Sequence, residues 1–170
     1  DYTSGNRDGS GLAATKSFDE SRIPTEPQHN PDFWFNTQIE RRGTSGIQPP
    51  CGAEEFWRRL RWFLERAVPV AEEAGVKLCA HPDDPPVPFM RGVYRPLHSP
   101  EGLRKLLELV PSPNNCLEFC QGTISTMRKV DIYRTIQEFV ASGRIGYVHF
   151  RNTSSRLPKY SEVFIDEGYV

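Results

Sequence analysis

Three stretches decide the fold of this chain: VKLCAHPDD (76–84), CLEFCQGT (116–123) and IGYVHFRN (145–152). Each is a short apolar run of strand length that stops where a polar loop begins. A segment with the apolar spacing of an amphipathic helix precedes each run. Right-handed crossovers place strands connected in this way in one direction, so the sequence predicts an α/β fold with a parallel sheet.

The first two helices have recognisable start and stop signals. Residues 53–75 carry apolar side chains at helical spacing, and Gly75 is expected to cap the end of this helix in a left-handed conformation. Pro69 lies inside the pattern and is expected to kink or divide the helix. Ser99 as cap and Pro100 at the first helical position predict the start of the second helix.

A third helix is expected over residues 130–141, and its apolar side is predicted from spacing to be formed by Tyr133, Ile136 and Val140. The later segment SEVFIDEG (161–168) is predicted to be either a fourth short extended segment or a loop.

Length and composition divide the 170 residues into two parts. Residues 1–51 are rich in Gly, Pro, Ser and Asn and are expected to form an irregular segment. Residues 52–170 are expected to form a partial (β/α)8 TIM barrel with about three to four parallel βα units, since a complete barrel takes about 250 residues. An open doubly wound sheet is the alternative arrangement of such units.

Charge and cysteine content limit the classes of function. The formal net charge of −1 and the pI near 6.5 provide no electrostatic argument for a nucleic-acid or membrane partner. The four cysteines do not follow the spacing of a secreted disulfide framework, and the sequence has no signal peptide or apolar run of membrane length. We therefore expect a cytoplasmic protein with reduced thiols.

Three metal-binding side chains lie at the ends of the three predicted strands: His81, Cys120 and His149. The carboxyl ends of parallel strands meet at one face of a βα fold, where such folds place their chemistry. The sequence therefore predicts a mononuclear metal site at this face. The alternative is an ordinary structural role for each side chain. A thiolate with two imidazoles would by itself suit Zn²⁺ or Fe²⁺.

The residues that follow these ligands suggest further roles. Asp83 and Asp84 are each able to ligate a metal, orient a ligand or carry a proton, or else to form the turn in HPDDPP. Arg151 offers a planar two-donor fork that suits a substrate carboxylate, or else anchors its loop. Asn152 follows it directly.

The motifs HPDDPP (81–86), FCQGT (119–123), HFRN (149–152) and SEVFIDEG (161–168), in this order, closely resemble segments of mannonate dehydratase. That family consists of metal-dependent sugar-acid dehydratases with a xylose-isomerase-like TIM barrel. The resemblance covers residues 56–168 and implies the dehydration of D-mannonate to 2-dehydro-3-deoxy-D-gluconate in hexuronate catabolism, with Fe²⁺ or Mn²⁺ as cofactor.

By resemblance, the family's metal ligands correspond to His81, Cys120 and His149. Asp83 would carry a proton or orient a ligand, and Arg151 and Asn152 would position the sugar acid. The family's fourth ligand is an Asp in a later Pro-Asp-His-Gly motif, which this sequence does not contain. The resemblance therefore implies a partial chain from the middle to late section of the barrel.

Two other functions stay open at this point. One is a different metal-dependent sugar isomerase or epimerase on the same barrel. The other is a truncated relative without catalytic activity. In either case an incomplete barrel would expose sheet edges and apolar helix faces, which favours a homo-oligomer.

Overall fold

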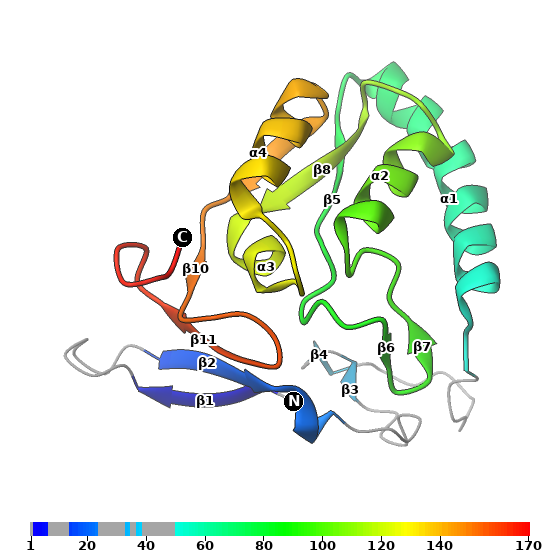
Figure 1. Ribbon diagram of the computed structural model, residues 1–170. Helices are drawn as coiled ribbons and strands as arrows, with labels where there is room; N and C mark the ends of the chain where they lie inside the picture. The colour runs from blue at the N-terminus through cyan, green and yellow to red at the C-terminus, as the bar shows by residue number, and fades with distance from the viewer. Residues whose placement is uncertain (1, 7–13, 24–32, 35–36, 39–49) are drawn as a thin grey trace.

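The computed structural model describes residues 2–6, 14–23, 33–34, 37–38 and 50–170 (Figure 1). Its centre is a three-stranded parallel sheet in the order β5-β8-β9: β5 (Leu78–Ala80), β8 (Asn115–Cys120) and β9 (Ile145–His149). Helices precede and connect these strands: α1 (Ala53–Ala74), α2 (Pro100–Leu109), α3 (Gln121–Thr126) and α4 (Ile132–Ala141). The predicted α/β class with parallel strands is confirmed, and the described residues form no closed barrel.

The strand register places chemically important residues side by side. Cys79 of β5 pairs with Cys116 of β8, and Cys120 at the end of β8 pairs with His149 at the end of β9. Side chains that are paired across neighbouring strands point to the same face of a sheet. Cys120 and His149 therefore share one face at the carboxyl ends of the strands, while Cys116 lies four residues away at the other end of β8.

Helix α1 runs without interruption through Pro69, so the helix is not divided there, and the alternative of a kink stays a prediction. Proline removes one backbone hydrogen bond from a helix interior, but packing on both sides can hold the helix together. Leu64 and Val68 before the proline, and Ala71 after it, are all buried against the rest of the molecule. The end of α1 is as predicted, because Gly75 has a φ of 66° and its N–H binds the carbonyl groups of the last turn.

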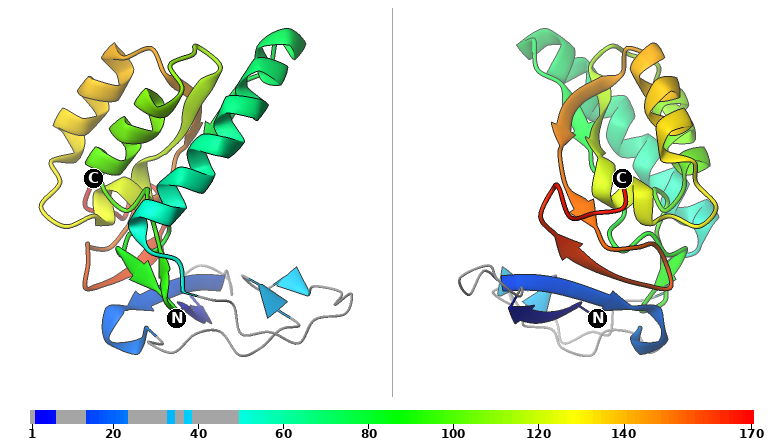
Figure 2. Two further views of the ribbon diagram at one scale, coloured as in Figure 1. Left: turned by 90° about the vertical axis from the view of Figure 1, so that its right-hand side faces the viewer. Right: turned by 60° about the vertical axis from the view of Figure 1, so that its left-hand side comes forward.

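The main hydrophobic core lies between the sheet and its helices, which cover one face of the sheet (Figure 2). Helix α2 begins at the predicted Ser99 cap and contributes Leu103 and Leu106, while β8 contributes Leu117 and Phe119. Full burial of each such side chain stabilises the fold by about 1.5–3 kcal/mol. This core holds β8 at the centre of the sheet.

The face of α4 that packs on the core differs in part from the predicted one: Ile136 packs against the core as expected, but Tyr133 and Val140 do not. Ile132, Thr135 and Phe139 are buried, whereas Tyr133 and Val140 are 64% and 61% exposed. The helix carries apolar side chains on two faces, and spacing alone does not choose between them. Phe119 of the central strand settles the choice, because its ring packs against Phe139 with centroids 6.1 Å apart.

A second, antiparallel sheet joins the two ends of the chain. Its strands lie in the order β1 (Tyr2–Asn6), β2 (Ala14–Asp19), β11 (Lys159–Val163) and β10 (Asn152–Thr153). Figure 2 shows β1 and β2 across the bottom of the molecule, beneath the parallel sheet. The segment 1–51 is therefore not irregular throughout, and the boundary predicted at residue 51 stays a prediction.

Side-chain contacts explain the pairing of β2 with β11. The rings of Phe18 and Tyr160 have centroids 5.3 Å apart, and Lys159 lies 2.6 Å from Asp19.

Two-stranded hairpins and one short 3-10 helix complete the described structure: η1 (Glu20–Arg22), β3 (Phe33–Trp34) with β4 (Thr37–Gln38), and β6 (Phe89–Met90) with β7 (Val93–Tyr94).

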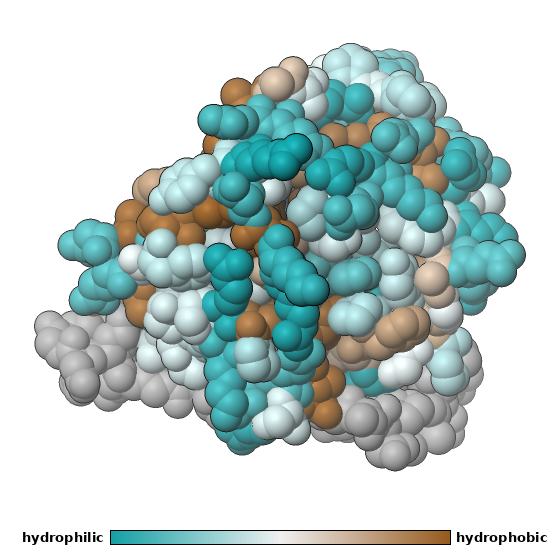
Figure 3. Space-filling model, in the orientation of Figure 1, coloured by the Kyte–Doolittle hydropathy of each residue, from teal (hydrophilic) through white to brown (hydrophobic). Residues whose placement is uncertain are grey.

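Strand β9 is an edge of the parallel sheet, and apolar side chains are exposed on and beside it. Tyr147, Val148 and Phe150 are each more than half exposed. The face seen in Figure 3 is mostly hydrophilic, with hydrophobic residues in smaller patches. Among the described residues, no helix combines the length and the apolar character needed to cross a membrane.

The contact between α2 and the loop before it leads to a first prediction. A Cβ atom at Gly102 would collide with the carbonyl oxygen of Pro96 and approach the Pro96 carbonyl carbon to 3.1 Å. Gly102→Ala should therefore lower the free energy of unfolding, measured with urea, by about 2 kcal/mol or more. Gly52→Ala is the matched control, because no atom lies within 4 Å of the added carbon. Equal losses in the two variants would contradict this packing.

Candidate metal centre

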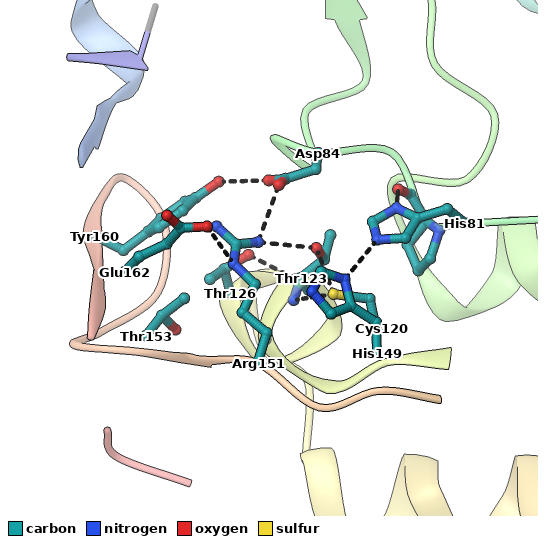
Figure 4. A network of polar contacts seen from close by, with 12 residues as sticks. His81, Asp84, Cys120, Thr123, Thr126, His149, Arg151, Thr153, Tyr160 and Glu162 are labelled. Carbon is teal, nitrogen blue, oxygen red and sulfur yellow. Dashed lines mark hydrogen bonds and ion pairs between the residues drawn. The ribbon is translucent and has the colours of Figure 1, made fainter. Parts of the chain in front are cut away.

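Three strand ends bring His81, Cys120 and His149 together. Cys120 and His149 are the last residues of β8 and β9, and His81 directly follows β5. One ligand atom from each residue lies within 4.8 Å of the others, and His149 Nδ1 is 3.4 Å from His81 Nε2 (Figure 4). The structure thus gathers the three residues that the sequence singles out, at a spacing that one metal ion can bridge.

Cys120 is fully buried and is surrounded by hydrogen-bond donors. The Thr123 hydroxyl lies 3.1 Å from its sulfur, and the Thr123 backbone N–H donates to the sulfur over 3.4 Å. Burial alone would raise the pKa of the Cys120 thiol, but hydrogen bonds from His81 and Thr123 outweigh it and hold this pKa below its ordinary value. The thiolate is the form that binds metal ions, so the surroundings of Cys120 suit a metal ligand.

His81 is oriented from both sides of its ring. Its hydrogen bond with Cys120 raises the pKa of His81 to about 8, although burial acts in the opposite direction. Its Nδ1 lies 2.6 Å from the Pro82 carbonyl oxygen, which leaves Nε2 on the side of the other two ligands. Histidine ligands commonly donate their second ring N–H to a carbonyl in this way. The donor set therefore fits a divalent cation, which would take the place of the proton shared by His81 and Cys120.

Asp83 is held within its own loop. Its carboxylate accepts the Leu97 backbone N–H over 2.7 Å and lies 3.4 Å from the Arg95 guanidinium. Burial raises the pKa of Asp83, and the nearby Arg95 charge opposes this effect. These contacts anchor the segment that carries His81 and favour the charged carboxylate, whereas burial favours the neutral form of Asp83.

Arg151 and Asn152 are both buried, at 9% and 1% exposure, and both have protein partners. Arg151 forms ion pairs of 2.9 Å with Asp84 and with Glu162. The Asn152 side-chain NH₂ donates to the carbonyl groups of Ile165 and Val170, over 2.8 and 2.7 Å. Nothing in the structure tests the expected role of Arg151 and Asn152 in binding the sugar acid, which stays a prediction.

Sequence reasoning missed a group of residues around Arg151: Thr123, Tyr160 and Glu162. The Arg151 guanidinium lies 3.2 Å from the Thr123 hydroxyl, and the Tyr160 hydroxyl donates to Asp84 over 3.0 Å. Two spacings in the sequence could have indicated that Asp84 and Thr123 lie near the metal ligands. Asp84 follows His81 by three residues and Thr123 follows Cys120 by three, so both extend from ligand-bearing strand ends.

Comparison with known proteins identifies the family. Residues 38–167 match the family model of D-mannonate dehydratase (UxuA). The chain belongs to the D-mannonate dehydratase family. It is 35% identical over 128 residues to mannonate dehydratase 2 of Halalkalibacterium halodurans. This matched region is 74% of the present chain and 37% of that protein. It is 39% identical over 120 residues to mannonate dehydratase of Thermotoga maritima. This matched region is 70% of the present chain and 33% of that protein.

A solved member of the D-mannonate dehydratase family has a similar structure. The crystal structure of mannonate dehydratase from Streptococcus suis serotype 2 matches with a TM-score of 0.65 and 30% sequence identity. The match covers 71% of this chain and 35% of that one. The chain thus spans about a third of the length of the relatives it matches.

The contact between His81 and Cys120 leads to a second prediction. In the metal-free protein, the His81 ring signals measured by NMR should titrate with a midpoint near pH 8. Cys120→Ala removes the hydrogen bond and leaves the burial, so the midpoint should fall to His81's ordinary value of 6.5 or below. Because the folded pKa is the higher one, the contact stabilises the fold below about pH 6.5, and this stabilisation is lost as the pH rises through about 8.

Cys116→Ala is the matched control for this titration, because Cys116 is a buried thiol at the opposite end of β8. It should leave the His81 midpoint unchanged. A midpoint near 6.5 in the unsubstituted protein would contradict the contact.

Proposed function

We propose that this chain carries the metal-binding part of an enzyme that dehydrates D-mannonate to 2-dehydro-3-deoxy-D-gluconate in hexuronate catabolism. The observation that supports it is the convergence of His81, Cys120 and His149 to within 4.8 Å in a chain of this family. The mannonate dehydratases of Halalkalibacterium halodurans and Thermotoga maritima are named for the same substrate.

We propose Fe²⁺ or Mn²⁺ as the ion held by these three residues, with Fe²⁺ preferred because Mn²⁺ is the harder ion and a thiolate is a soft ligand. When bound, a divalent cation of this kind stabilises the negative charge that develops on substrate oxygens as the proton next to the carboxylate is removed. His81, Cys120 and His149 would hold the ion, and a site with three protein donors would allow the sugar acid to bind to it, as in catalytic metal sites.

The chain's own residues prepare this site in separate ways. The Pro82 carbonyl orients the His81 ring, and the Thr123 hydroxyl and backbone N–H hold the Cys120 sulfur. Asp83 is the proposed proton carrier. Burial favours its neutral form, and a carboxyl with a raised pKa can protonate a leaving hydroxyl.

We also propose a cytoplasmic setting and self-association. All four cysteines are free, which fits a reducing compartment. The exposed apolar side chains of the β9 edge fit contact with a second copy of the chain. The substrate is a small sugar acid, and the net charge of −1 offers no attraction for nucleic acid.

The third prediction tests the function directly. A protein that carries this chain at the full length of its relatives, loaded with Fe²⁺ without oxygen, should convert D-mannonate to a 2-keto-3-deoxy acid, detected by a colorimetric assay for that product. A chelator should abolish product formation, and His149→Ala should reduce it at least about 100-fold, since one of three donors is lost. His98→Ala is the matched control, because His98 is a half-buried histidine outside the donor group, and this variant should keep the activity.

Two results would contradict the proposed activity. Interconversion of a ketose and an aldose without keto-acid formation would favour a sugar isomerase. Metal binding without either product would favour a relative that lacks catalysis.

A further inference from the structure

One guanidinium lies where all three ligand-bearing segments meet. Arg151 follows His149 by two residues, Asp84 follows His81 by three, and Thr123 follows Cys120 by three. Arg151 Nη1 is 2.9 Å from Asp84 Oδ2 and 3.2 Å from Thr123 Oγ1 (Figure 4). A single side chain thus connects the three strand ends that carry the candidate metal ligands.

The second sheet encloses this guanidinium from the other side. Glu162 of β11 lies 2.9 Å from Arg151 Nε, and Tyr160 of the same strand donates its hydroxyl hydrogen to Asp84 over 3.0 Å. The carbon stem of Arg151 lies across Gly122, where an added Cβ would come within 2.7 to 3.0 Å of three of its carbon atoms. A buried cation held by two carboxylates and by tight packing has little freedom to move.

The Thr123 hydroxyl connects Arg151 to Cys120 through two hydrogen bonds. The hydroxyl has a single hydrogen and accepts one from Arg151, whose guanidinium can only donate. Its own hydrogen is then directed to the Cys120 sulfur, 3.1 Å away. The sulfur therefore receives a hydrogen bond whose direction depends on Arg151.

We propose that Arg151 is a positioning residue that fixes the three ligand-bearing segments relative to one another before a cation binds and directs the Thr123 hydroxyl to Cys120. The inference rests on the proposed metal site and assigns Arg151 a different task from contact with the sugar acid. A substrate carboxylate would have to displace Asp84 or Glu162 to reach the guanidinium. Loss of Arg151 therefore acts on the metal ligands first.

The fourth prediction compares Arg151→Lys with Arg144→Lys. Lysine keeps the charge and loses the planar fork that reaches several partners. Arg144 is the matched control, because it is a partly buried arginine that donates to the Asn115 carbonyl at the amino end of β8, far from the ligands. In the metal-free protein, Arg151→Lys should shift the NMR ring signals of both His81 and His149, and Arg144→Lys should shift neither.

Co²⁺ then serves as a spectroscopic probe of the ligands. Arg151→Lys should weaken Co²⁺ binding about 10- to 100-fold, the usual effect of removing a residue that supports metal ligands. Thr123→Val should move the sulfur-to-cobalt charge-transfer band, because the hydroxyl donor to Cys120 is lost. Thr123→Ser should restore the band. The Thr123 variants keep the test decisive if Arg151→Lys does not fold.

Unchanged histidine signals and Co²⁺ affinity in Arg151→Lys, or an unmoved charge-transfer band in Thr123→Val, would overturn the positioning role. A raised KM for D-mannonate with unchanged Co²⁺ affinity would make Arg151 a substrate contact instead. If the unsubstituted chain binds no Co²⁺ through His81, Cys120 and His149, the proposed metal function fails, while the histidine signals of metal-free Arg151→Lys still decide the role of Arg151.

Discussion

The register of the parallel strands is the constraint on which the site depends. Cys120 pairs with His149 across β8 and β9, and β5 pairs with the first half of β8, so that His81 comes beside them. A shift of one residue would turn one donor to the opposite face of the sheet. The buried side chains of α2, α4 and β8 maintain this register, so the hydrophobic core and the candidate metal centre are parts of one arrangement.

Short-range signals in the sequence predicted most of this arrangement, because they depend on local chemistry. The Ser99 cap, the Gly75 cap and the three apolar runs require nothing beyond neighbouring residues, and the strand ends of a βα fold converge by rule. The pairing of β2 with β11 was out of reach, because it joins segments about 140 residues apart through side-chain contacts that spacing does not reveal. For α4 the prediction was correct for Ile136 and wrong for Tyr133 and Val140, because two faces of this helix carry apolar side chains.

The polar residues around Arg151 show why a ligand set is easier to predict than its support. Residue type alone marks His81, Cys120 and His149 as possible metal ligands. In the sequence, Thr123 and Glu162 have no such distinguishing feature, because threonine and glutamate are common on protein surfaces. Their role follows from a shared partner and not from any motif. Hydrogen bonds and ion pairs of this kind bring together the loop after β5, the start of α3 and the antiparallel sheet, which have no backbone pairing in common.

Strand β9 has a described neighbour on one side only, and its last residue is His149. The outward backbone groups of an edge strand form a template along which a foreign strand can dock. Any polypeptide that extends the sheet there would also crowd one of the three donors. If a second copy of the chain docked along this edge, it would lie beside His149, so self-association would then compete with metal binding at that imidazole.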